Sequence, residues 1–352
     1  MTPQTLTFTQ HVGEALDAAI GRLAPSSIFV LADSHTATLV VPELHSQALR
    51  EATLITIEAG DAHKDLAALT HVWQALQTGG ATRKSLMVNV GGGVVTDLGG
   101  LAAATFKRGI NFINVPTTLL GAVDAAVGGK TGINFGGLKN EVGIVAMAAE
   151  VIVSTRFFVT LPPSELRSGF AEVLKHGLLK SGDETLRLLD YDIEAADLDT
   201  LLPLLETSVR VKQDIVLQDP LEHGLRRALN LGHTVGHAFE SMALRQNAPI
   251  PHGYAVAWGL AVELVLSHMK LQFDTSLLYR VVHRVRDIYG TPRITCDDYP
   301  ALLDLMRHDK KSERGEINCT LLRAPGDVVT GNAIADDEMT AALDIWRDLM
   351  GM

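Results

Sequence analysis

The sequence predicts a two-part α/β protein, with a parallel β-sheet domain at the N-terminus and a mostly α-helical domain at the C-terminus. Short apolar runs alternate with helical patterns before residue 160, and the pattern after that point is helical almost throughout. A length of 352 residues also exceeds what one simple core usually holds. We therefore expect domains at residues 1–160 and 161–352.

Three apolar stretches account for the predicted parallel strands. They read "SSIFVLAD" at 26–33, "ATLITIEA" at 52–59 and "SLMVNVGGG" at 85–93. Strands that are buried on both faces appear as continuous apolar runs rather than as alternating ones. The segment from Lys64 to Leu76 has helical periodicity and lies between two of these runs. Strands that alternate with helices indicate a parallel sheet covered by helices.

The helical part begins at "LPPSEL", residues 161–166. Proline is favoured in the first turn of a helix, and Ser164 and Glu165 would occupy that opening turn. The longest apolar run, "YAVAWGLAVELVLS" at 254–267, contains Glu263 and is too short to span a bilayer. We interpret it as a buried helix.

The composition narrows the classes of function. Hydrophobic residues at 47% and charged residues at 20% are typical of a soluble globular protein. A net charge of -11 argues against nucleic acid as a partner and requires any anionic substrate to bind at a local basic cluster. Two cysteines, Cys296 and Cys319, do not form a disulfide framework, and the first residues lack a signal-peptide pattern. We expect a cytoplasmic protein with no membrane partner.

A first glycine-rich stretch, "VNVGGGVVTDLGG", runs from Val88 to Gly100. It places a strand end, three glycines and a helix start in succession, which lets a phosphate approach backbone N–H groups. The spacing differs from the common G-x-G-x-x-G dinucleotide fingerprint. A turn of this kind can also simply connect a strand to a helix, so both interpretations stay open.

A second stretch, "VPTTLLGAVDAAVGGKTGINFGGLKN" at 115–140, combines glycines with Lys130 and Lys139. Glycine exposes the backbone and lysine offers a mobile positive charge, which together suit an anionic ligand. The alternative is a hairpin with solvated lysines.

The helical part contains candidate metal ligands. His233 and His237 are four residues apart in "LNLGHTVGHAFE", so they share one helix face, but Thr234 stands where a zinc protease has its catalytic Glu. His252 follows prolines at a helix start, and Glu172 precedes Lys175 by three residues. Glu172, His233 and His252 would give a two-His, one-carboxylate site with open positions for substrate. A lone His is more often structural, and Glu172–Lys175 alone could be an ordinary surface pair.

Arg226 lies four residues before Asn230 and seven before His233. If one helix carried all three, they would share a face and place a guanidinium beside the metal, where it could clamp a carboxylate. The alternative is a solvated arginine like its neighbour Arg227.

These segments together resemble the 3-dehydroquinate synthase family of sugar phosphate cyclases. The matching segments span residues 58–311 in family order and include "EAGDAHK", "GGGVVTDLGG", "RGINFINVPTTLLGAVDAAVGGKTGIN", "LKNEVG", "TLPPSELRSGFAEVLKHG", "HGLRRALNLGHTVGHAFE", "HGYAVAWG" and "DKK". The resemblance implies a dehydroquinate synthase-like fold, with an NAD-binding domain followed by a metal- and substrate-binding domain.

The resemblance also implies a set of ligand-binding positions. The NAD-binding positions would be Asp61, Lys64, Gly92, Gly93, Val94, Val95, Asp97, Thr117, Thr118, Lys130, Lys139, Phe157 and Thr160. Glu172, His233 and His252 would hold a divalent metal, zinc or alternatively cobalt. The family's further active-site positions map to Arg108, Asp124, Lys130, Asn140, Lys175, Lys212, Arg226, Asn230, His237 and Lys310.

The implied reaction converts 3-deoxy-D-arabino-heptulosonate 7-phosphate into 3-dehydroquinate and phosphate, a step of the shikimate pathway to aromatic amino acids. Transient oxidation by NAD, phosphate elimination, re-reduction and an intramolecular aldol closure would make the enzyme a lyase. The resemblance further implies a homodimer. Two alternatives remain at this stage: a metal-dependent polyol dehydrogenase, and another sugar phosphate cyclase.

Overall fold

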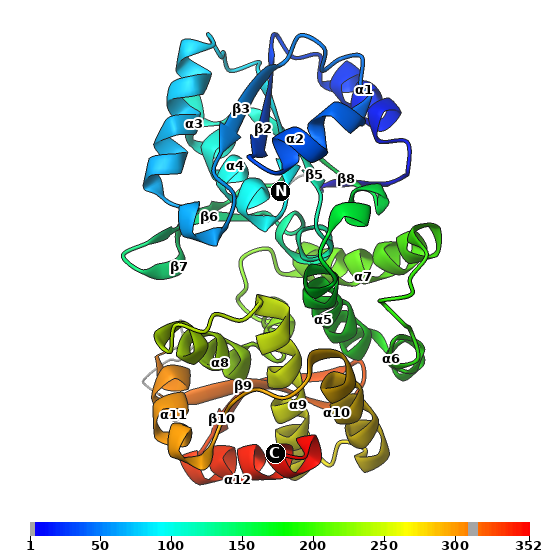
Figure 1. The fold of residues 1–352 in the computed structure, drawn as a ribbon, viewed down its shortest axis with the longest axis vertical. Helices are drawn as coiled ribbons and strands as arrows, with labels where there is room; N and C mark the ends of the chain where they lie inside the picture. The colour runs from blue at the N-terminus through cyan, green and yellow to red at the C-terminus, as the bar shows by residue number, and fades with distance from the viewer. Residues whose placement is uncertain (1–3, 309–315) are drawn as a thin grey trace. The chain divides into compact units, whose positions relative to one another are not determined.

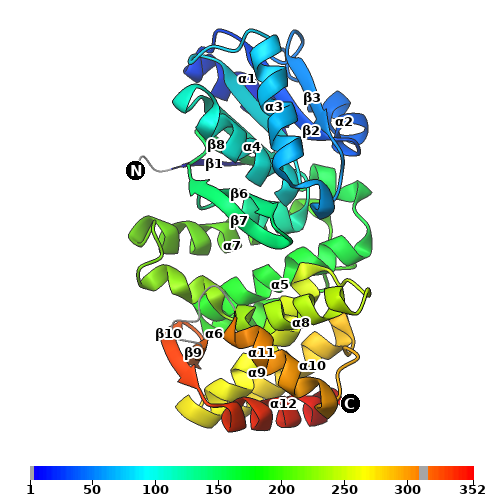
Figure 2. The ribbon, with the colours of Figure 1, turned by 90° about the vertical axis from the view of Figure 1, so that its left-hand side faces the viewer.

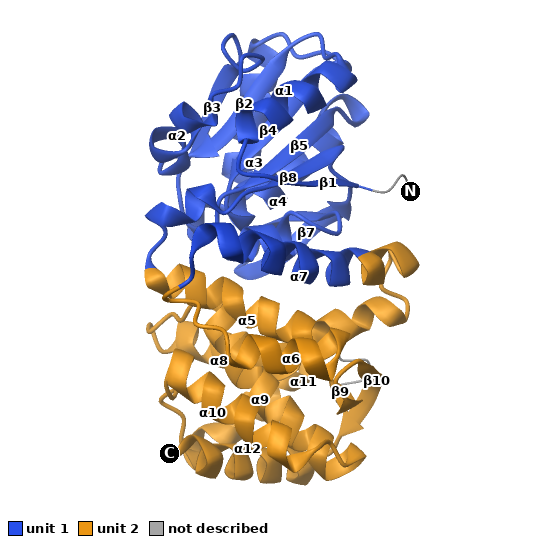
Figure 3. Ribbon diagram, turned by 90° about the vertical axis from the view of Figure 1, so that its right-hand side faces the viewer, with its two compact units in different colours: residues 1–162, 196–213 blue, residues 163–195, 214–352 orange. Residues whose placement is uncertain are grey.

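A computed structural model describes residues 4–308 and 316–352. The chain divides into two compact units (Figure 3). Unit 1 comprises residues 1–162 and 196–213, and unit 2 comprises residues 163–195 and 214–352. Residues 196–213 lie beyond the boundary expected near residue 160, yet they group with unit 1.

Unit 1 is built on a six-stranded sheet in the order β1-β8-β5-β4-β2-β3, and all its neighbouring strands are parallel (Figure 1). The strands are β1 Thr5–Phe8, β2 Ile28–Asp33, β3 Thr53–Ile57, β4 Leu86–Gly91, β5 Asn111–Pro116 and β8 Glu150–Val153. The three apolar runs predicted as strands are β2, β3 and β4, so the parallel sheet is confirmed.

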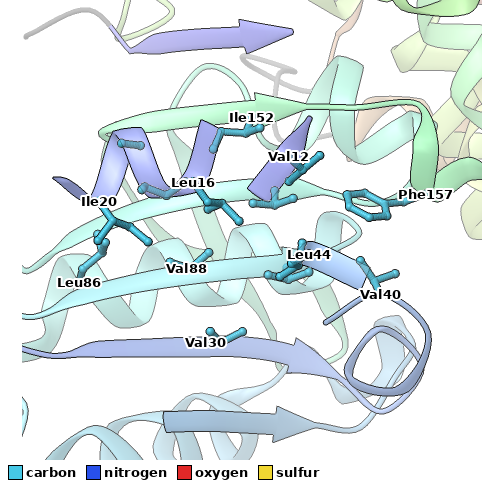
Figure 4. Close-up of a cluster of buried hydrophobic side chains, with 14 residues drawn as sticks. Val12, Leu16, Ile20, Val30, Val40, Leu44, Leu86, Val88, Ile152 and Phe157 are labelled. Carbon is cyan, nitrogen blue, oxygen red and sulfur yellow. The ribbon is translucent and has the colours of Figure 1, made fainter. Parts of the chain in front are cut away.

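Helices cover both faces of this sheet. The principal ones are α1 Val12–Leu23, α3 Leu66–Thr78 and α4 Gly93–Thr105. Val12, Leu16 and Ile20 of α1 point into an apolar cluster that includes Val88 and Ile152 of the strands (Figure 4). Burial on both faces explains why β4 has no exposed position.

The connections of unit 1 are short, and several of them carry predicted site residues. They are α2 Thr36–Leu39, η1 Val41–Leu44, η2 Asp61–His63, η3 Phe106–Arg108, the π-helical turn η4 Gly121–Ala125 and η5 Arg156–Thr160. Strands β6 Lys130–Phe135 and β7 Leu138–Val145 form a separate antiparallel hairpin. The second glycine-rich stretch therefore ends in a hairpin, but its residues 115–129 lie before the hairpin, and Lys139 forms an ion pair with Asp61. Helix α7 Leu198–Gln218 contributes residues 198–213 to unit 1.

Unit 2 is mostly helical, as expected. Its helices are α5 Pro163–Lys180, α6 Gly182–Leu189, η6 Leu225–Asn230, α8 His233–Arg245, α9 His252–Leu271, α10 Thr275–Tyr289, η7 Cys296–Asp298, α11 Tyr299–Arg307 and α12 Asp336–Met350 (Figure 2). The predicted double-proline helix start is the start of α5. A two-stranded antiparallel sheet, β9 Ile317–Ala324 and β10 Asp327–Ile334, was not predicted.

Helix α9 is the centre of unit 2. It contacts α5, α8, α10, α12 and β9, and its residues 255–267 are buried. A helix surrounded on all sides is apolar all round, which explains the long apolar run. Within the described ranges, 4–308 and 316–352, no helix is long and apolar enough to cross a membrane.

Candidate metal centre and nucleotide-binding residues

The predicted metal ligands come together within unit 2. Glu172 lies in the middle of α5, His233 is the first residue of α8 and His252 is the first residue of α9. One ligand atom from each lies within 4.8 Å of the other two. Oε1 of Glu172 is 3.4 Å from Nε2 of His233 and 3.8 Å from Nε2 of His252.

The Glu172 carboxylate is fully buried, and its Oε1 has no hydrogen-bond donor among the residues that the structure describes. A buried carboxylate oxygen without a donor costs free energy unless a cation compensates it. Two imidazole nitrogens and one carboxylate oxygen are the donors found in catalytic zinc sites. The residues therefore fit a divalent metal with three protein ligands, which leaves a fourth coordination position for water or substrate.

The close approach of α9 to α5 depends on Gly253. A Cβ atom at this position would lie 1.8 Å from the carbonyl oxygen of Ser168, one turn before Glu172 on α5. The Gly253 N–H also donates to Ser168 Oγ at 3.0 Å. The glycine thus allows the first turn of α9 to touch α5, and this contact brings His252 to Glu172.

A buried glutamate fixes the start of α8. Glu263 of α9 accepts hydrogen bonds from the backbone N–H groups of Gly232 at 2.6 Å and Val235 at 3.4 Å. These residues flank His233 and Thr234, so the carboxylate holds the turn that presents His233. In the sequence, Glu263 is an isolated charge inside an apolar run. Such a charge indicates a structural role, because a buried carboxylate needs hydrogen-bond donors.

Lys175 forms a buried ion pair with Glu172 through Oε2. Its Nζ also donates to the carbonyl oxygen of Leu229 at 2.9 Å. Both side chains of the pair are at most 1% exposed. The surface-pair interpretation is wrong, because the lysine places a positive charge directly beside the candidate ligand.

The side chain of His237 lies one turn after His233 on α8, as the spacing predicted. The centre of its ring is 5.3 Å from that of His233 and 5.9 Å from that of His252. The three imidazoles thus lie together, and two of them, His233 and His252, face the buried Glu172 carboxylate.

The single helix expected for Arg226, Asn230 and His233 is wrong. Arg226 and Asn230 belong to the 3₁₀ helix η6, which ends before Leu231, whose backbone is not helical, and a left-handed Gly232. A left-handed residue breaks the helical path, so the three side chains do not follow one helix face. The Arg226 side chain is buried, and its Nη1 donates to the carbonyl oxygen of Pro220 at 2.7 Å.

The loop before Arg226 is organised by Asp219. Its carboxylate accepts hydrogen bonds from the backbone N–H groups of His223, Gly224 and Arg226. These three hydrogen bonds, with that from the Gly224 N–H as the largest cause, lower the pKa of Asp219 to about 2. Asn230 Nδ2 donates to Glu222 Oε1 at 2.9 Å. Sequence reasoning missed Asp219, although an Asp before a proline is a recognisable turn signal.

In unit 1 the two glycine-rich stretches meet. The turn of Gly91 and Gly92 precedes α4, and the Thr117 N–H donates to the Gly91 carbonyl oxygen at 3.0 Å. A Cβ on Gly92 would lie 3.1 Å from Cγ2 of Thr118. The predicted positions Gly92 to Asp97, Thr117 and Thr118 therefore lie on adjoining turns.

Lys64 links this turn to the hairpin. Its buried Nζ donates to Asp97 Oδ2 at 2.5 Å and to Asn140 Oδ1 at 2.6 Å. Lys139 lies 3.4 Å from Asp61 as an ion pair. Segments that are 76 residues apart along the chain thus form one polar cluster at the edge of the glycine turn.

Burial raises the pKa of Asp97 to about 6, against the lowering effect of the Lys64 charge. Nearby, Lys212 of α7 pairs with the Asp124 carboxylate and donates to the Asp124 carbonyl oxygen at 2.6 Å. Unit 1 therefore holds two buried or half-buried pairs of a lysine with an aspartate, Lys64 with Asp97 and Lys212 with Asp124.

The remaining predicted positions are more dispersed. Arg108 is exposed and lines a surface hollow of about 660 Å³ together with Arg83 and Lys107. The Phe157 side chain belongs to the apolar core, and Thr160 closes η5. Lys130 is exposed on β6. Lys310 lies outside the described residues.

Comparison with known proteins identifies the family to which the sequence belongs. The sequence model of the 3-dehydroquinate synthase N-terminal domain matches residues 54–168, and that of the C-terminal domain matches residues 169–312. A 3-dehydroquinate synthase of Parabacteroides distasonis is 42% identical over 353 residues, which covers both chains completely. The chain belongs to the 3-dehydroquinate synthase family.

Solved structures of related cyclases share the fold of this dehydroquinate synthase family member. A 2-deoxy-scyllo-inosose synthase complexed with carbaglucose-6-phosphate, NAD+ and Co2+ superposes with a TM-score of 0.83 at 22% identity, covering 96% of this chain and 95% of that chain. A 2-epi-5-epi-valiolone synthase from Streptomyces hygroscopicus with NAD+ and Zn2+ bound gives a TM-score of 0.80 at 26% identity, covering 99% of this chain and 97% of that chain.

Proposed function

We propose that this protein is a 3-dehydroquinate synthase that converts 3-deoxy-D-arabino-heptulosonate 7-phosphate into 3-dehydroquinate and phosphate. The observation that carries the proposal is the convergence of Glu172, His233 and His252 in a chain that is 42% identical to a dehydroquinate synthase over its full length. The two other cyclases are 22% and 26% identical to this chain, which favours dehydroquinate synthase over other sugar phosphate cyclases.

The proposal assigns NAD to unit 1 and a divalent metal, zinc or cobalt, to unit 2. Bound NAD would accept and return a hydride, and the bound metal would lower the pKa of substrate hydroxyl groups. The cofactor would contact the turn from Gly92 to Asp97 and the neighbouring Thr117 and Thr118. Asp61, Lys64, Lys130, Lys139, Phe157 and Thr160 complete the proposed set.

The chain's own residues would bind and orient the anionic substrate. Its phosphate and carboxylate need cations, which a protein of net charge -11 must supply locally. Arg108, Lys130, Lys212, Arg226 and Lys310 are the proposed sources, with Asp124, Asn140 and Asn230 as further substrate contacts. The buried contact of Arg226 with Pro220 holds the guanidinium in one orientation.

His237 is the proposed proton-transfer group. An imidazole is well suited to accept and return a proton near neutral pH. Its ring lies beside both candidate metal-binding imidazoles, where substrate hydroxyl groups would be held. Lys175 would stabilise negative charge that develops beside Glu172, because its ammonium group is already buried at that carboxylate.

Family membership also supports a cytoplasmic homodimer. Cys296 and Cys319 are not joined by a disulfide, which fits a reducing compartment. Light scattering of the purified protein measures the oligomeric state directly.

The function is tested by identifying the products. We expect the purified protein, supplied with a divalent metal, NAD and the heptulosonate phosphate, to release phosphate and 3-dehydroquinate in equal amounts. A sugar phosphate without the carboxylate is the matched control and should yield no carbocycle. Turnover of the control in preference to the heptulosonate would contradict the proposal and indicate another cyclase.

A further inference from the structure

The two candidate metal-binding histidines are anchored in different ways on the side away from Glu172. Nδ1 of His233 lies 3.1 Å from the backbone carbonyl oxygen of Leu231. Nδ1 of His252 lies 3.0 Å from the carboxylate oxygen Oε2 of Glu240. In both residues the other ring nitrogen, Nε2, faces Glu172.

These partners determine which ring nitrogen carries the proton. A carbonyl oxygen and a carboxylate oxygen both accept hydrogen bonds, so Nδ1 must be the donor in each ring. A neutral imidazole that is protonated on Nδ1 has its lone pair on Nε2. Both histidines therefore present an electron pair toward the Glu172 carboxylate, as metal binding requires.

Glu240 lies on the same face of helix α8 as His233 and His237. His233, His237 and Glu240 are spaced four and three residues apart on α8, so they stack along one side of the helix. The Glu240 side chain is 14% exposed, and the His252 side chain is 26% exposed. The charge of the carboxylate is therefore only partly screened where it meets the imidazole.

We propose that Glu240 is a positioning residue for the metal centre. It holds His252 in the tautomer that is protonated on Nδ1, and its negative charge makes Nε2 a stronger electron-pair donor than Nε2 of His233, whose partner is a neutral carbonyl. A carboxylate behind a metal-binding imidazole orients the ring and raises its affinity for the metal. This inference rests on the proposed metal site but not on the identity of the substrate.

The first test is made on the metal-free protein. Nitrogen-15 NMR of the imidazoles, at a pH where they are neutral, distinguishes the two tautomers. We expect His252 to be protonated on Nδ1 in the wild type and in Glu240→Gln, whose amide oxygen still accepts the hydrogen bond. Glu240→Ala should shift His252 toward the Nε2-protonated form. An unchanged His252 tautomer in Glu240→Ala would overturn the proposal.

Two other histidines serve as internal controls in the same spectra. The Nδ1 partner of His233 is Leu231, and His268 lies 2.8 Å from the carbonyl oxygen of Phe273 through Nδ1. Neither His233 nor His268 makes this Nδ1 contact with Glu240, so the tautomer of both rings should stay unchanged in every Glu240 variant. If Glu240→Ala lost the tautomer signals of His233, His252 and His268 together, the variant would be unfolded. The metal affinity of Glu240→Gln would then test the proposal.

The second test measures metal affinity by competition with a chelator, without substrate or turnover. We expect Glu240→Ala to bind Zn²⁺ about 10–100-fold more weakly, and Glu240→Gln to lie between it and the wild type because it keeps the hydrogen bond without the charge. Equal affinity of all three proteins would overturn the proposal. If affinity depends on Glu240 but no dehydroquinate forms, the proposed function fails while this inference stands.

Discussion

At the scale of single residues, buried charges mark both candidate sites. Glu172 and Lys175 are buried together in unit 2, and Lys64 is buried against Asp97 in unit 1. Removing charges from water is expensive, so such groups persist where a partner or a ligand compensates them. Sequence spacing identified Glu172 and Lys175, whereas Lys64 and Asp97 were expected only from the family resemblance. Spacing could not show that the Glu172–Lys175 pair is buried, because an i, i+3 pair looks the same on any helix face.

Asp97 gives a prediction about pH. Its pKa of about 6 lies above the ordinary aspartate value of 3.8, so the folded protein holds this proton more tightly than the unfolded chain does. The free energy of unfolding should therefore fall as the pH rises from about 4 to about 6, by on the order of 2 kcal/mol for this group. Carbon-13 NMR of the Asp97 carboxyl in the cofactor-free protein should show a midpoint near 6.

The Asp97→Asn variant assigns this signal, because the titration with the midpoint near 6 should disappear from its spectrum. A midpoint near 4 in the wild type would contradict the account. It would mean that the Lys64 charge fully offsets the effect of burial on the pKa of Asp97.

At the scale of elements, the positions of the candidate metal ligands depend on how closely the helices α5, α8 and α9 approach one another. The sequence placed α5, α8 and α9 correctly as helices, because their apolar periodicity and proline starts are local signals. It could not place Arg226 correctly, since spacing alone assumes that a helix continues. The left-handed Gly232 interrupts it, and the prediction overlooked that a glycine directly before His233 could do so.

Gly253→Ala tests the contact between α9 and α5. The added methyl group would meet the Ser168 carbonyl oxygen, so the first turn of α9 must move away from Glu172. We expect a loss of about 1–3 kcal/mol in stability from overpacking and at least a roughly tenfold loss of Zn²⁺ affinity in the folded protein. Thermal unfolding and chelator competition measure the two effects.

Gly182→Ala is the matched control in the same unit. A Cβ there meets nothing within 4 Å, so stability and metal affinity should stay close to those of the wild type. Wild-type metal affinity in Gly253→Ala would show that His252 does not depend on this close approach.

At the scale of the whole molecule, the sequence predicted two parts and their fold classes. The parallel strands were predictable because burial on both faces leaves a continuous apolar run, as in β4. The grouping of residues 196–213 with unit 1 was not predictable, because an amphipathic pattern shows that a helix has a buried face but not what covers it. The same limit applied to the polar cluster around Lys64, whose partners Asp97 and Asn140 come from distant segments.

In the proposed reaction, NAD is used catalytically and is regenerated in every turnover. The most direct measurement supplies the heptulosonate phosphate in large excess over NAD and follows phosphate release together with the absorbance of reduced cofactor. We expect many molecules of phosphate per molecule of NAD, with no net accumulation of NADH. Reduced cofactor that appears in proportion to product would contradict it and would identify the protein as a dehydrogenase.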